Sequence, residues 1–100
     1  MNRNQIIIKK VLNELAKAEQ KFPGFPIDPL HASSIIVEEL GELQQACLKW
    51  TYEGGYIEPV AVEALHTAAM ALRFLFNIKF MKCNPSQQKY SKRLRKKNEH

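Results

Sequence analysis

The chain has 100 residues, enough for one small domain whose buried fraction is low, so that a partner chain would stabilise it. Its net charge of +5 is unevenly distributed, because residues 1–78 hold seven Lys/Arg against nine Asp/Glu, a balance of −2, while residues 79–100 hold eight against one, a balance of +7. An ordinary apolar content of 45%, with four glycines and five prolines, excludes a chain that is disordered from end to end.

Cysteine usage and the apolar stretches favour a reduced, cytoplasmic location and no membrane partner. Cys47 falls on an apolar helix face, where a buried free thiol is commoner than a disulfide, here to Cys83. The first ten residues hold only three consecutive apolar side chains, too few for a signal-peptide core or a membrane span. The long apolar stretch 60–80 contains Glu63 and Arg73 among other polar residues. A buried helix of a soluble protein explains it better than a bilayer does.

Helical periodicity without a turn residue predicts a first helix over residues 3–21, whose mixed-sign polar face we expect to be only solvated. Three prolines and a glycine within 22–29 end this helix. Asp28 followed by Pro29 is a helix start, since it combines an N-cap side chain with a proline in the first turn. A second helix is therefore predicted from Pro29 to about Glu53.

The third helix is predicted to return antiparallel to the second. Gly54 is available for a left-handed C-terminal cap, and Glu58-Pro59 opens a helix that we run to about Lys82. Its apolar residues cover most of its circumference, and its polar residues before Lys79 fall within an arc of about 120°. These polar residues are Glu63, His66, Thr67, Arg73 and Asn77. A helix of this kind needs cover on several sides, which a second copy of the chain would supply.

The fold class predicted is all-α, with a helical hairpin core of three to four helices that assembles into a four-helix-bundle-type homo-oligomer, either a dimer or a tetramer. The helical domain is expected to span residues 1–84. Residues 85–100 form a basic C-terminal tail, predicted to be a short helix or disordered.

The second helix is amphipathic and carries the candidate chemistry. At about 100° per residue its polar side chains form one line, and its apolar side chains form a core face on the other side, with Trp50 as an anchor. The polar line contains Glu38, Glu42, Gln45 and Lys49, and the core face contains Ile36, Leu40, Leu43, Cys47 and Trp50. Glu38, Glu39 and Glu42 lie so close together that they repel one another unless a cation or water lies over them.

A hairpin can bring this polar line against the polar strip of the third helix, where Glu63 would join it. Magnesium binds one or two carboxylates together with waters and substrate phosphates, and a bound metal orients and acidifies a water that attacks a phosphoanhydride. Lys49 and Arg73 can meet the remaining phosphate charge. The simpler alternatives are that the glutamates are solvated, that Arg73 pairs with Glu63, and that Lys49 pairs with Glu53.

The spacing of these acids resembles a known bipartite signature. Glu38-Glu39-Leu-Gly-Glu42, twenty intervening residues and Glu63-Ala-Leu-His66 are similar to the E-E-x-x-E and E-x-x-D motifs of the MazG-like all-α nucleoside triphosphate pyrophosphohydrolases. The resemblance covers residues 30 to 80, about half the chain. It implies an oligomer of helical hairpins that hydrolyses a nucleoside triphosphate to the monophosphate and pyrophosphate.

The resemblance also assigns roles. Glu38, Glu39, Glu42 and Glu63 would be ligands of magnesium, with manganese as the alternative metal. Glu39 and Glu42 would be catalytic, one of the acids serving as base for the attacking water. Apart from the resemblance, Lys49 and Arg73 would contact the substrate from the polar lines of their helices, and His66 would contact it in one of the outcomes given next.

His66 stands where the family usually has aspartate, and an imidazole suits manganese, zinc or other transition metals better than magnesium. Three outcomes remain open. His66 supports Glu63 or touches phosphate, the site prefers a softer metal, or the protein binds nucleotide without hydrolysing it.

The basic tail favours a different class of function. Clustered Lys/Arg with one tyrosine in 89–97 is an electrostatic footprint for nucleic acid or an acidic partner. The alternative to an enzyme is therefore a non-catalytic helical binding module that contacts such a partner through its tail.

Overall fold

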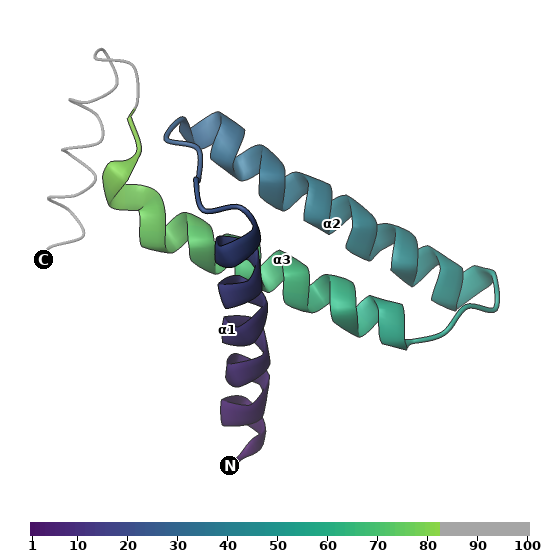
Figure 1. The fold of residues 1–100 in the computed structure, drawn as a ribbon. Coiled ribbons are helices and arrows are strands. Elements are labelled where there is room, and N and C mark those ends of the chain that lie inside the picture. Colours follow the sequence, from purple (N-terminus) through teal and green to yellow (C-terminus); the bar gives the residue numbers. More distant parts are fainter. Residues whose placement is uncertain (83–100) are drawn as a thin grey trace, which may run out of the picture.

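A computed structural model of the protein describes residues 1–82, and this part of the chain is helical without a strand (Figure 1). The elements are α1 (Arg3–Lys21), α2 (Pro29–Tyr52), α3 (Glu58–Asn77) and a short 3-10 helix η1 (Ile78–Phe80). The all-α class and the three predicted helices are confirmed. The expected boundary at residue 84 and the basic tail lie outside the described residues.

Local capping explains where the first two helices begin. The Asn2 side chain accepts a hydrogen bond from the backbone N–H of Gln5, and the Gln5 side chain accepts one from the N–H of Asn2, each at 2.9 Å. Asp28 accepts from the N–H of Leu30 at 3.1 Å, and Pro29 occupies the first turn of α2. These side chains satisfy amide groups that have no partner within the helix. The predicted start of α2 at Pro29 is confirmed.

The turn after α2 sets the return of the chain. Gly54 has a φ of +71°, the left-handed conformation that glycine adopts without strain, as predicted. The N–H of Gly55 donates to the carbonyl of Lys49 at 2.9 Å, and a Cβ at Gly55 would lie 3.2 Å from that backbone. This close approach folds α3 back antiparallel to α2 (Figure 1).

The third helix begins at Glu58, as predicted, but ends earlier than predicted. Its N-cap residue is Ile57, whose side chain makes no capping hydrogen bond. Glu58 lies in the first turn, where its negative charge interacts favourably with the helix dipole. The α-helix ends at Asn77 and tightens into η1, although we expected it to run to Lys82. After η1 the N–H of Lys82 donates to the carbonyl of Ile27 at 2.8 Å, so the chain leaves the helix to pair with the α1–α2 loop.

The core lies where α3 meets the other two helices. Val11 and Leu15 of α1 pack with Ala69 and Met70 of α3, and half-buried apolar residues of α2 and α3 surround them. Figure 1 shows α2 lying along α3 while α1 crosses it steeply. The third helix is therefore the element that both of its neighbours share.

The inward face of α2 is rotated from the predicted one. Ala32 and Ala46 are buried and Glu39 is half-buried between them, whereas Leu40 is 52% and Trp50 is 48% exposed. The small alanines allow α3 to approach on their side of the helix. The predictions that Leu40 lies in the core and that Trp50 anchors it were wrong for the single chain.

Much apolar surface remains exposed in the described residues. The first half of α1, residues 3–10, is exposed throughout and projects away from the hairpin (Figure 1). Leu75 and Phe76 of α3 are 60% and 55% exposed, and none of the large side chains in residues 1–82 is fully buried. By length and composition Glu58–Phe80 could also cross a membrane, a criterion that a core helix of a soluble protein meets as well.

Arg73 ties α3 to the end of α1. Its side chain is buried, with 4% of the residue exposed, and its guanidinium donates to the carbonyls of Ala18, Phe22 and Gly24. It also lies 5.0 Å from the ring centroid of Phe25, which covers it. The planar fork of an arginine suits several acceptors at once, so this one residue holds the α1–α2 loop.

We expect Arg73→Ala to lower the free energy of unfolding by about 2–4 kcal/mol, because three carbonyl groups lose a charged donor. Urea denaturation followed by circular dichroism measures this. Arg73→Lys should recover only part of the loss, since an ammonium group cannot reproduce the fork. Lys17→Ala, an exposed change on α1, is the control, and an equal loss in both alanine variants would contradict this role of Arg73.

Candidate functional site

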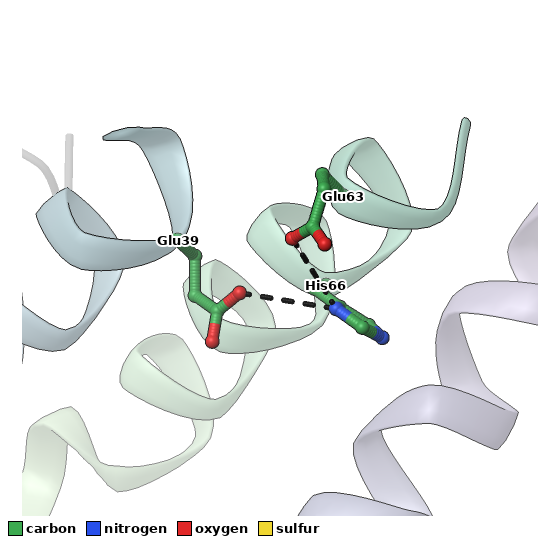
Figure 2. Close-up of side chains that lie close together, drawn as sticks. All are labelled: Glu39, Glu63 and His66. Atoms are coloured by element: carbon green, nitrogen blue, oxygen red, sulfur yellow. Dashed lines mark ion pairs between the residues drawn. The ribbon is translucent and has the colours of Figure 1, made fainter. Parts of the chain in front are cut away.

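Two helices bring three potential metal ligands together. Glu39 of α2 and Glu63 and His66 of α3 point toward one another, as Figure 2 shows, and their ligand atoms all lie within 4.8 Å of one another. The Nδ1 atom of His66 lies 3.5 Å from Oε2 of Glu63 and 3.9 Å from Oε2 of Glu39. The antiparallel hairpin therefore forms a compact group of two carboxylates and one imidazole.

Helical spacing and packing explain this convergence. Glu63 and His66 are three residues apart on α3 and therefore share one face of the helix. Glu39 comes from the inward face of α2. All three side chains are partly buried, at 23%, 38% and 27% exposed for Glu63, His66 and Glu39, so their charges are incompletely hydrated.

The inner oxygen atoms of both carboxylates lack a hydrogen-bond donor. Oε2 of Glu39 and Oε2 of Glu63 are buried and make no hydrogen bond in the described part of the chain. A buried charged acceptor without a partner is unfavourable, and two of them beside each other repel. A cation between Glu39, Glu63 and His66 would neutralise both oxygens, which makes this donor set fit a divalent metal with coordination positions left for water or substrate.

Glu42 adjoins this group one turn along α2 from Glu39. The pKa of the Glu42 carboxyl is raised above its ordinary value of 4.5, first because its protonated form hydrogen-bonds Glu63. The negative charges of Glu39 and Glu63 raise the pKa further, while His66 acts in the opposite direction. A carboxylate with a raised pKa is a better proton acceptor near neutral pH.

Glu14 of α1 belongs to the same group, although the polar face of this helix was expected to be only solvated. Its Oε2 lies 3.3 Å from Nε2 of His66, and its Oε1 lies 3.2 Å from Nζ of Lys17. A sequence signal did exist, because Glu14 interrupts the apolar series Val11, Leu15 and Ala18 at helical spacing. A charged residue within such a stripe faces the neighbouring helix.

Glu38 and Lys49 lie outside the group of converging side chains. Glu38 is exposed and lines a hollow of about 420 Å³, bounded also by Glu14, Glu39 and His66. Lys49 is exposed and lines a second hollow, of about 400 Å³, together with Glu42 and Glu63. The carboxylates therefore border two hollows, one toward α1 and the other toward the α2–α3 turn.

The position of Arg73 differs from both sequence-based interpretations of it. It also lines the hollow toward α1, but its donors are taken up by backbone carbonyls, not by Glu63 or by an open phosphate site. His31 is exposed. The junction of α2 and α3, which we call the seam, thus contains Glu39 and Glu42 from the first motif and both Glu63 and His66 from the second.

Comparison with models of known families, with curated proteins and with solved structures found no match to this chain. The site is therefore interpreted from its own geometry.

We expect Glu42→Gln to raise the thermal unfolding midpoint of the metal-free protein at neutral pH. The folded-state pKa of Glu42 is raised, so its protonation favours the fold below pH about 4.5, and this contribution is lost as the pH rises through the raised pKa. The advantage of the glutamine variant should therefore disappear below pH about 4.5. Scanning calorimetry with a chelator present measures it.

Glu19→Gln on the exposed face of α1 is the matched control, and its effect should not follow the same pH dependence. A Glu42→Gln variant that is no more stable than the wild type at neutral pH would contradict the raised pKa of Glu42.

Proposed function

We propose that the protein is a nucleoside triphosphate pyrophosphohydrolase that uses a divalent metal, magnesium or manganese, and releases a nucleoside monophosphate and pyrophosphate. The observation that carries this proposal is the convergence of Glu39, Glu63 and His66 on one point with two buried, unpaired carboxylate oxygens. The resemblance of 38–66 to the MazG-like signature supports the reaction class. His66 in place of aspartate favours manganese.

The residues of the seam would have different roles in this reaction. Glu39, Glu63 and His66 would hold the metal, which when bound supplies charge neutralisation on the phosphates and a more acidic water. Glu42 would accept the proton of the attacking water, a role that its raised pKa suits. As the water oxygen bonds to phosphorus, the bond between the α- and β-phosphates breaks, and the leaving pyrophosphate carries the displaced electron pair.

Lys49 would neutralise the negative charge of the leaving pyrophosphate. It lines the same hollow as Glu42 and Glu63, together with Gln45 and Tyr56. Its ammonium group is a mobile point charge on an exposed helix end, which suits a phosphate that enters and leaves. Glu38, at the mouth of the other hollow, would act on the metal only through water.

We further propose that the chain works as a homo-oligomer, a dimer or tetramer in the cytoplasm. Ile6, Ile7 and Ile8 on the projecting half of α1 are 42%, 49% and 56% exposed, and α3 exposes Leu75 and Phe76. The described part of the chain has no fully buried large side chain, so its core is small. A second copy covering these residues would enlarge it.

The reaction is tested by pyrophosphate release from a panel of ribo- and deoxyribonucleoside triphosphates with magnesium or manganese. We expect turnover with at least one nucleotide and a loss of about a hundredfold or more for Glu39→Gln or Glu63→Gln, because each removes a ligand charge. Glu19→Gln is the control. His66→Asp should move the preference toward magnesium, and absence of turnover with either metal would refute the enzyme.

The assembly is tested by light scattering coupled to size-exclusion chromatography. We expect a dimer or tetramer at micromolar concentration that Ile7→Glu or Phe76→Glu shifts toward the monomer, because a buried charge at an apolar interface costs several kcal/mol. Gln20→Glu, on an already polar part of α1, should leave the mass unchanged. A wild-type protein that is monomeric throughout would exclude the assembly.

A further inference from the structure

The imidazole of His66 is contacted on both of its nitrogen atoms. Nδ1 faces the inner oxygens of Glu63 and Glu39, while Nε2 faces Oε2 of Glu14 at 3.3 Å. A neutral imidazole has one N–H and one lone pair, on different nitrogens. The hydrogen-bond partner of Nε2 therefore influences whether Nδ1 directs an N–H or a lone pair at the two carboxylates.

We propose that Glu14 is a positioning residue that accepts a hydrogen bond from Nε2–H of His66 and so directs the Nδ1 lone pair at the point between Glu39 and Glu63. The site becomes one histidine and two carboxylates, a donor set that selects manganese or another transition metal over magnesium. The inference rests on the metal site of the proposed function. It adds α1, which lies outside the matched motifs, to the helices that build this site.

The position of Glu14 is held from three directions. Val11 and Leu15, its neighbours on α1, are buried against α3 at 9% and 4% exposure. Arg73 holds the carbonyl of Ala18, one turn further along the helix. Lys17 pairs with Oε1 of Glu14, which leaves Oε2 directed at His66.

In this arrangement Nδ1 of His66 lies 3.5 and 3.9 Å from two unpaired carboxylate oxygens. A lone pair on Nδ1 in that position is repulsive without a metal, and a cation between the three groups turns all of them into ligands. A carboxylate behind a metal-binding histidine orients the ring and strengthens it as a donor. Glu14 is in the place that this role requires.

The metal-free protein gives the first test, through the ¹⁵N chemical shifts of the His66 ring at alkaline pH, where an ordinary imidazole is neutral. We expect a larger share of the Nε2–H tautomer in the wild type than in Glu14→Ala, because Glu14 favours a proton on Nε2. Glu14→Gln keeps an oxygen acceptor and should keep the wild-type share, which a purely charge-based role would not explain. A share that Glu14→Ala leaves unchanged would overturn the inference.

Manganese binding gives the second test, measured by electron paramagnetic resonance and calorimetry with manganese or magnesium alone. We expect Glu14→Ala to weaken manganese binding by about 10–100-fold and to lower the manganese-to-magnesium affinity ratio, with Glu14→Gln close to the wild type. In a His66→Ala background, Glu14→Ala should have no further effect, because Glu14 acts through His66. Glu19→Ala is the matched control on α1.

The outcomes separate this inference from the function on which it rests. Wild-type binding of manganese that Glu14→Ala leaves unchanged refutes the role of Glu14 and leaves the metal site standing. Equal losses in Glu14→Ala and Glu14→Gln refute positioning by a hydrogen bond, as does a full Glu14 effect without His66. A tautomer population that depends on Glu14, with no binding of either metal, refutes the metal site itself.

Discussion

The polar strip of α3 is the constraint on which the arrangement of the other helices depends. An apolar helix of 20 residues can pack in many rotations, because hydrophobic contact is not directional. Arg73 and His66 remove that freedom, since each finds its partners on α1 or on both α1 and α2. Arg73 has buried donors that the end of α1 and the following loop satisfy, and a change of crossing angle would leave them unpaired.

The same constraint creates the unfavourable part of the structure. By holding α1 and α2 against one side of α3, it places Glu14, Glu39 and Glu63 around one imidazole. The pKa of the neighbouring Glu42 is raised first by a hydrogen bond with Glu63 and further by the negative charges of Glu39 and Glu63. Repulsion that persists inside a well-packed seam, without a hydrogen bond to relieve two of the oxygens, is typical of a site that receives a cation or a charged ligand.

The exposed apolar surface and the open hollows of the site have a common explanation in the small size of the domain. A three-helix domain of this size has too little interior to surround α3, and within residues 1–82 the projecting half of α1 adds no residue to the core. Both hollows beside the carboxylates are partly open to solvent. In the proposed assembly the second copy would cover apolar residues and would also close the space proposed for the nucleotide.

Local chemistry made part of the structure predictable. Asp28-Pro29 and Gly54 set their helix boundaries through interactions within a few residues, so the sequence by itself determined the three helices, the hairpin and the two acidic motifs. Only the tertiary structure decided that Glu39, and not Glu38, turns inward, that Glu14 reaches His66, and that Arg73 binds carbonyls. Adjacent residues on a helix point about 100° apart, and which of them meets a neighbour depends on where small side chains such as Ala32 and Ala46 let the helices approach.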